Sequence, residues 1–169
     1  MNKSTILVEK VDGKNKNYRA YLRYMNIVIR RATEKDASSL LPLIEQLGYK
    51  ISEAILLKNI KLHLSTDYNL FVALINDELV GFISLHIYQY VHLEDRLSRI
   101  TALCVDAEHR SFGIGAKLLV HAEEYIKSEG CKIIELTSGV QREDAHRFYE
   151  RHGYLEKRKR LVKDILNGI

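Results

Sequence analysis

The stretch Val105-Asp-Ala-Glu-His-Arg-Ser-Phe-Gly-Ile-Gly-Ala116 decides how this sequence folds. A β-branched apolar run ends at Val105, and an amphipathic pattern that stops at Gly130 follows, which predicts a strand that turns directly into a helix. Such a turn presents unpaired backbone N–H groups at the positive end of the helix dipole. Gly113 and Gly115 let an anion approach them without meeting a Cβ, and Arg110 adds charge at the rim. The turn is therefore a candidate phosphate site.

Two glycines at this spacing also occur in tight turns that bind nothing, so neighbouring residues must decide. A dinucleotide fingerprint would need glycine or alanine where Leu118 stands. A Walker loop would need Gly-Lys-Ser/Thr, whereas Gly115 is followed by Ala-Lys-Leu. Both nucleotide-binding alternatives are weakened.

The rest of the pattern predicts alternating strands and helices, with Thr33 and Asp36 as a capping box and a bend or interruption at Pro42. A hairpin turns across Asn76-Asp-Glu78. The expected elements are strand 27–29, helix 37–47, helix 52–64, strands 70–75, 79–88 and 99–105, helix 114–129, strand 132–136, helix 145–152 and a final strand 154–163.

Two spaced motifs resemble the GNAT superfamily of N-acetyltransferases. Arg110-Ser-Phe-Gly-Ile-Gly115 matches the family signature Arg/Gln-x-x-Gly-x-Gly/Ala. Downstream, Asp144-Ala-His-Arg-Phe-Tyr-Glu-Arg-His-Gly-Tyr154 is similar to the family's Asn-x-x-Ala-x-x-Phe-Tyr-x-x-x-Gly-Phe region. The resemblance covers roughly residues 27–165 and implies an α/β fold, α+β in some schemes, with a mixed, mainly antiparallel sheet and helices on both faces.

The resemblance also implies where acetyl-CoA binds, as a cosubstrate, with no metal. Backbone N–H groups of the glycine turn would hold the pyrophosphate, and the preceding strand would pair with the pantetheine arm. Asp144 stands where the family often has asparagine and cannot donate an amide N–H. The expected CoA-binding residues are Leu103, Cys104, Val105, Arg110, Ser111, Phe112, Gly113, Ile114, Gly115, Ala116, Asp144 and Phe148.

Catalysis requires a neutral amine, a stabilised oxyanion and a proton for the thiolate. Tyr149 matches the family's tyrosine acid, although it could also be a core aromatic beside Phe148. Many relatives carry an acidic base where Thr101 and Ala102 stand, so the usual base is absent here. The base is left open among four candidates, Glu94, Glu135, His86 and His92.

Length and composition fit one globular domain, with 169 residues, 46% apolar and 28% charged. The net charge of +4 lies in residues 1–26, which we separate from the domain 27–169 as a basic hairpin or disordered arm. Cys104 and Cys131 are expected to be reduced and buried. The chain lacks a long apolar segment and a signal-peptide pattern, so a cytoplasmic, non-membrane protein is expected.

The expected function is direct transfer of an acetyl group from acetyl-CoA to a primary amine of a small molecule or peptide. One alternative is a non-catalytic CoA-binding regulatory module, suggested by the missing strand acid. A less favoured one is a nucleic-acid binder that uses residues 1–26 and the basic run 157–160. A homodimer through Tyr88-Gln-Tyr90 and the final strand is also open, and the sequence does not identify the acceptor.

Overall fold

The computed structural model describes residues 26–64, 67–157, 161–163 and 165. It divides into two compact units, Met1–Leu136 and Thr137–Ile169, and each is considered by itself. The basic extension falls outside the described residues except for Asn26, as do residues 158–160 of the basic run. No helix in the described residues is long and apolar enough to cross a membrane.

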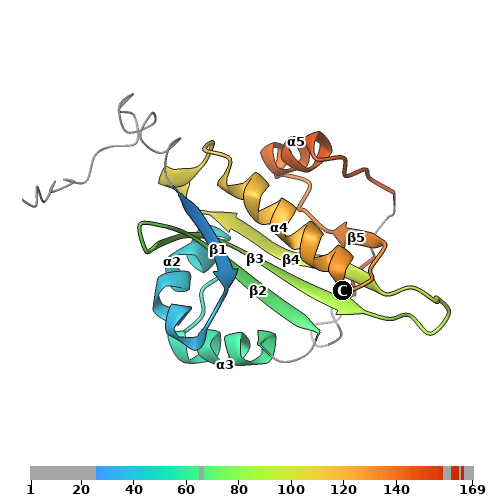
Figure 1. Cartoon of the computed structure of the whole chain (residues 1–169), viewed down its shortest axis with the longest axis horizontal. Coiled ribbons are helices and arrows are strands. Elements are labelled where there is room, and N and C mark those ends of the chain that lie inside the picture. Colours follow the sequence, from blue (N-terminus) through green and yellow to red (C-terminus); the bar gives the residue numbers. More distant parts are fainter. Residues whose placement is uncertain (1–25, 65–66, 158–160, 164, 166–169) are drawn as a thin grey trace, which may run out of the picture. The chain divides into compact units, whose positions relative to one another are not determined.

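The N-terminal unit is built on one five-stranded sheet in the order β1-β2-β3-β4-β5 (Figure 1). The first four strands pair antiparallel, and β4 and β5 pair parallel, which confirms the expected mixed, mainly antiparallel sheet. The strands are β1 (Ile27–Arg31), β2 (Tyr68–Ile75), β3 (Glu78–Tyr88), β4 (Leu97–Val105) and β5 (Ile133–Leu136).

The β2–β3 hairpin is tight because its two turn residues, Asn76 and Asp77, both have positive φ, at 48° and 65°. This backbone matches the right-handed twist of the flanking strands, and Asn and Asp tolerate it better than most residues. The predicted hairpin is thereby confirmed.

Helices cover both faces of this sheet. They are η1 (Glu34–Asp36), α2 (Ala37–Gln46), α3 (Glu53–His63), η2 (Ala107–His109) and α4 (Ile114–Ser128). The expected interruption at Pro42 is wrong, because α2 runs unbroken through it. Proline removes only its own N–H bond there, and the buried side chains of Leu40 and Leu43 hold the helix on both sides of it.

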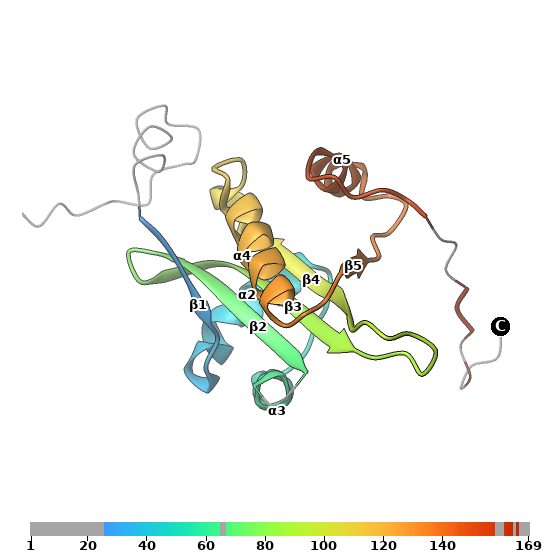
Figure 2. The ribbon, with the colours of Figure 1, turned by 45° about the vertical axis from the view of Figure 1, so that its right-hand side comes forward.

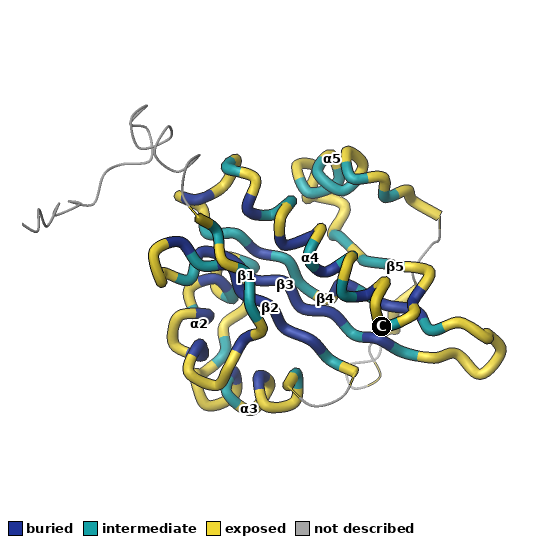
Figure 3. Tube along the Cα trace, viewed as in Figure 1, coloured by how far each residue is buried: buried dark blue, intermediate teal, exposed yellow. Residues whose placement is uncertain are grey.

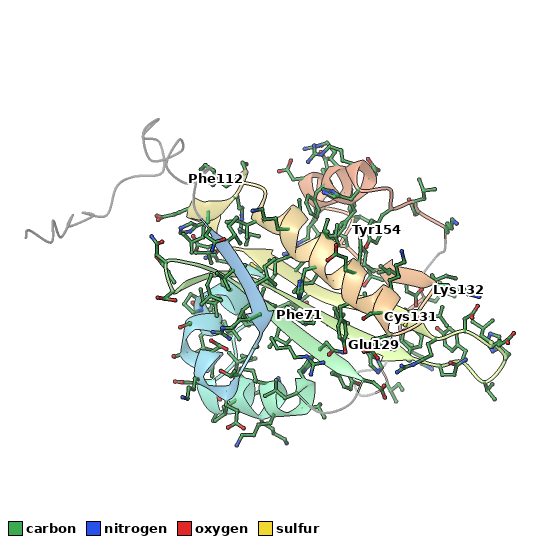
Figure 4. All side chains as sticks on the ribbon, in the orientation of Figure 1. Phe71, Phe112, Glu129, Cys131, Lys132 and Tyr154 are labelled. Atoms are coloured by element: carbon green, nitrogen blue, oxygen red, sulfur yellow. The ribbon has the colours of Figure 1, made fainter. Side chains whose placement is uncertain are left out.

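Alternate residues of each strand point to opposite faces, so the unit has two cores. On one face, Val72, Phe82 and Cys104 cluster with α2 and α3. On the other, Phe71 (labelled in Figure 4) contacts the rings of His121 and Tyr125 on α4, at 4.7 and 5.2 Å between centroids. Figure 2 shows α4 on the opposite side of the sheet from α2 and α3, and in Figure 3 the buried residues follow the middle of the strands.

Among its described residues, the C-terminal unit contains one helix, α5 (Glu143–Arg151). The final strand expected over 154–163 is absent from the described residues of that range, since 154–157 and 161–163 have no strand conformation. Alternating polarity allows a strand, but a strand also needs a partner to satisfy its backbone. In the described residues, no segment pairs with this one.

Candidate functional site

An open edge of β4 is the first feature of the site. The parallel pairing between β4 and β5 covers only Leu97↔Ile133 to Ile100↔Leu136. Residues 101–105 of β4 continue with β3 on one side and, among the described residues, no strand on the other. Alternate residues of a strand direct their N–H and C=O groups to opposite edges, so this stretch offers backbone groups to an extended ligand. We call residues 101–105 the open edge.

A β-bulge lies where the open edge begins. Ser84 pairs with Ala102 but Leu85 pairs with Ile100, so Thr101 is the extra residue. The hydroxyls of Ser84 and Thr101 form a hydrogen bond across the bulge. Bulges interrupt a ladder and redirect backbone groups. The sequence analysis treated Thr101 only as the position of a missing base and did not find this feature.

The glycine turn lies between the open edge and α4. Gly113 is the N-cap of α4 with φ 79°, and Ser111 also has a positive φ of 69°. No side chain caps this helix and its first turn carries no acidic residue. The first intrahelical bond to the cap runs from the Lys117 N–H to the Gly113 carbonyl, so the preceding N–H groups remain for an anion.

The side chains of the predicted CoA segment lie mostly inward. Cys104 and Ile114 are buried, while Leu103, Val105, Phe112, Gly115 and Ala116 are half-buried. The Cys104 thiol contacts the carbonyl of Leu43 on α2, at 3.4 Å. Only the backbone of Cys104 is therefore available at the open edge.

A hydrogen-bond network fixes the approach to the turn. Arg110 does not stand free at the rim; its Nε donates to the Val105 carbonyl at 2.9 Å and its Nη2 to Gln46 Oε1 at 3.2 Å. Gln46 also donates to Asp106 Oδ2 at 2.8 Å, and Asp106 Oδ1 accepts from the backbone of Glu108. Burial would raise the pKa of Asp106, but these hydrogen bonds outweigh it and lower that pKa.

Gln46 was missed from the sequence because nothing in an exposed helix end indicates a contact with residues 60 positions away. It ties the end of α2 to both ends of η2, since its Oε1 also accepts from the Ala107 N–H at 3.0 Å. The geometry of the turn therefore depends on α2 as well as on α4.

A polar row crosses the sheet beside the open edge. Tyr68, His86, Arg99 and Glu135 are cross-strand partners on four successive strands, β2 to β5, and we call these four residues the polar row. Their face is the one on which α2 and α3 pack, because Tyr68 and His86 alternate in phase with Val72 and Phe82.

Glu135 is the anionic end of the polar row. Its Oε1 accepts hydrogen bonds from Arg99 Nη2, at 2.9 Å, and from the Tyr88 hydroxyl. Burial and the bond to Glu135 raise the pKa of Tyr88 above its ordinary value. Burial opposes the charge of Arg99, but Glu135 more than compensates and raises the pKa of Arg99. The carboxylate thus has two fixed donors at the start of the open edge.

The four candidate bases are now distinguished by position. His86 belongs to the polar row and stacks on Tyr68 with 4.2 Å between ring centroids. His92 stacks on Tyr90 at 5.4 Å in the loop after β3, and Glu94 is exposed in the same loop. Of the four, only Glu135 is on the strand that separates from β4.

The C-terminal unit carries the predicted acid on α5. The Tyr149 ring contacts Phe148 and Tyr154 at 5.2 and 5.5 Å between centroids. Burial raises the pKa of the Tyr149 phenol, and the Arg142 cation opposes this. Because this pKa is raised, the Tyr149 phenol stays protonated at neutral pH. Asp144, at the start of the same helix, is exposed and pairs with Arg147 at 2.5 Å. Across the described residues, no group of His, Cys, Asp and Glu side chains has metal-site geometry.

The open edge of β4 leads into a glycine turn, and the second motif lies on α5. Known proteins share these features. Residues 33–154 match the sequence model of the acetyltransferase (GNAT) family. The chain belongs to this family. As a GNAT acetyltransferase it transfers an acetyl group to an amine and uses an acyl-CoA as the donor.

This GNAT chain is similar to one curated protein in sequence and to two solved structures in fold. It is 34% identical over 142 residues to the aminoalkylphosphonate N-acetyltransferase of Salmonella typhimurium, covering 81% of this chain and 90% of that protein. A GNAT family acetyltransferase of Staphylococcus aureus has 27% identity and a TM-score of 0.72, covering 83% of this chain and 100% of that one. An aminoglycoside N-acetyltransferase in complex with CoA has 15% identity, a TM-score of 0.76 and coverage of 84% and 96%, and it shows the fold alone.

Proposed function

We propose that this chain moves the acetyl group of acetyl-CoA to the primary amine of a small molecule that also carries an anionic group. The observation that carries the acceptor class is the 34% identity to an aminoalkylphosphonate N-acetyltransferase along most of both chains. The position of Arg99 supports it. Its side chain is 37% exposed and pairs with Glu135 next to the open edge, and a guanidinium there favours an anionic group on the acceptor.

Acetyl-CoA would bind along the backbone described above. The N–H groups of residues 111–116 would hold the pyrophosphate, and the pantetheine arm would extend the sheet at the open edge, from Val105 towards Thr101. Five residues of strand cover about 13 Å, which brings the thioester to the bulge. Its carbonyl oxygen would accept from backbone N–H groups released there, which supports an oxyanion as charge develops.

The chemistry requires three proton transfers. The acceptor enters as an ammonium and loses a proton to the Glu135 carboxylate, directly or through one water, and the free amine then attacks the thioester carbon. The tetrahedral intermediate, whose nitrogen is still cationic, collapses with cleavage of the C–S bond, and the Tyr149 phenol protonates the CoA thiolate. The Tyr149 phenolate takes the remaining extra proton from that nitrogen, which leaves the neutral amide, and Glu135 releases its proton to water. The raised pKa of Tyr149 supports the role of acid, since the proton is retained until the thiolate forms. The products are the amide and CoA; a cytoplasmic location and a homodimer stay predictions from the sequence.

The proposal is tested first by acetyl-CoA binding and then by thiol release over an amine panel. Gly113→Glu places a carboxylate at the anion-binding turn, and we expect loss of acetyl-CoA binding by calorimetry. Gly130→Glu is the matched control, because Gly130 also has a positive φ, 78°, but lies at the opposite end of α4. Equal binding by both variants and wild type would exclude the turn as the CoA site, and absence of turnover with every amine would overturn the activity.

A further inference from the structure

The face of the sheet on which α2 and α3 pack is apolar at one end of the strands and polar at the other. Under the two helices, the cross-strand partners Val72, Phe82 and Cys104 are apolar and buried. At the other end of the same face, the polar row spans four strands. All of its members are half-buried, so they are partly withdrawn from water without belonging to the apolar core. Partly buried polar groups cost free energy unless they find partners.

Arg99 is the member of this row with the most hydrogen-bond donors left for a ligand. Its guanidinium has five N–H donors, and in the described part of the chain its hydrogen bonds go only to Glu135. Its Nε is buried and has no hydrogen-bond partner among those residues. Yet 37% of the Arg99 side chain is exposed, so a ligand can reach the group from solvent. An arginine fork in this state suits a carboxylate, phosphonate or phosphate.

The Arg99–Glu135 pair is also a fixed dipole at the start of the open edge. Its positive end lies on β4 and its negative end on β5, and Tyr88 holds the carboxylate in place. A ligand with both charges is most stable antiparallel to this dipole, since each of its charges then faces the opposite one. His86, next to Arg99 in the row, adds a ring nitrogen on the anion's side.

We propose that the polar row binds a short zwitterionic acceptor, with the anionic group on Arg99 beside His86 and the ammonium on Glu135. This deepens the proposed function and rests on it, because the thioester must lie near the ammonium. Adjacent strands are about 4.8 Å apart, so the two charges of the acceptor should be separated by one or two carbon atoms. A longer ω-amino acid cannot span the pair in this way, and a polyamine would place a second cation against Arg99.

The test compares amines that differ in the group carried beside the amine. Aminomethylphosphonate and glycine, which carry an anionic group, are run against ethanolamine, which carries a neutral hydroxyl instead, and against the polycation spermidine, with wild type, Arg99→Gln and Arg99→Lys. We expect Arg99→Gln to raise the KM for aminomethylphosphonate about 10- to 100-fold and the KM for ethanolamine less than about threefold. Arg99→Lys should recover part of the loss, because it keeps the charge and loses the fork. Arg96→Gln is the matched control, an equally exposed arginine paired with Asp67, and should change neither KM.

Calorimetry with the CoA-saturated protein separates this inference from the activity. Binding of aminomethylphosphonate by wild type and its loss in Arg99→Gln support the inference, with acetyl-CoA affinity equal in both. Equal loss for ethanolamine and aminomethylphosphonate would mean that Arg99 acts only on the structure and would overturn it. Preference of wild type for spermidine would also overturn it and leave the acetyltransferase activity standing. Absence of acetyl-CoA binding and of turnover with all four amines would overturn the proposed function itself.

Discussion

The glycine turn and the polar row are built in opposite ways. The turn consists of consecutive residues, and its useful groups are backbone N–H donors placed by Gly113 and by the start of α4. The polar row takes one side chain from each of four strands, and the register of the sheet alone brings them together. A site of the first kind tolerates many side chains, whereas a site of the second kind changes with each of them. Donor binding and acceptor choice should therefore respond to different mutations.

Tyr149→Phe is the change with the largest expected effect, because it removes the proton donor and leaves both regions intact. We expect kcat to fall about 10²- to 10⁴-fold with the KM for acetyl-CoA nearly unchanged. Because burial raises the pKa of Tyr149, the alkaline limb of the wild-type pH profile should lie above pH 10, the ordinary value. Tyr154→Phe, which alters the neighbouring ring, should keep wild-type kcat, and similar losses in both variants would assign Tyr149 a packing role.

Glu135→Gln breaks the polar row at its anionic end. We expect kcat/KM for the amine to fall about 10²-fold, because the ammonium loses both its partner and its proton acceptor. Calorimetry should give unchanged acetyl-CoA binding, since the turn is built elsewhere. Glu129→Gln, at another glutamate paired with an arginine, is the control. Wild-type rates in Glu135→Gln would reopen the choice among His86, His92 and Glu94.

Gln46→Ala tests whether a change near the glycine turn affects donor binding and leaves acceptor choice unchanged. It removes the acceptor of Arg110 and the donor to Asp106, so the segment before Gly113 loses its tie to α2. We expect the KM for acetyl-CoA to rise about fivefold to tenfold, consistent with the loss of one or two hydrogen bonds. The preference among amines should not change. Glu45→Ala, at the exposed neighbouring position, is expected to leave the KM as in wild type.

Asp36→Asn tests a part of the fold that serves neither region. Asp36 accepts two hydrogen bonds from Arg30 and others from Thr33, and these lower its pKa, with Arg30 the largest cause. We expect a loss of about 1–2 kcal/mol in the free energy of unfolding at pH 7 with unchanged kinetics.

The sign of the pH dependence follows from the depressed pKa of Asp36. Its stabilisation is complete above the unfolded value of about 3.9 and is lost as pH falls through the lower folded value. The difference between wild type and Asp36→Asn should therefore be constant above about pH 5 and shrink in acid. Glu34→Gln, at an exposed ion pair with Lys61, should show little difference at any pH, and a gap that widens in acid would contradict the assignment.

The contrast also explains what the sequence could predict. The strand, the glycine turn and α4 were predictable because helical periodicity and glycine are local signals, and the second motif lay in one stretch. The sequence did not single out Arg99, because its role depends on the register between strands. It did not single out Gln46, because its role depends on the packing of α2 against η2. Glu135 and His86 were among the candidates, but only the register distinguishes them from Glu94 and His92. The strand expected at 154–163 is absent from the residues of that range that the structure describes, because alternation alone does not supply a pairing partner.

The connection between α4 and β5 limits how this protein can be altered. It is short, with Gly130 ending the helix and the buried Cys131 (labelled in Figure 4) bonded through its N–H to the Ile126 carbonyl at 3.2 Å. Deleting one residue here would shift β5 by one position against β4, and a shift of one reverses the two faces of a strand. Leu136 would then occupy the place of Glu135. The length of this connection therefore decides whether a carboxylate or an alkyl group meets the incoming amine.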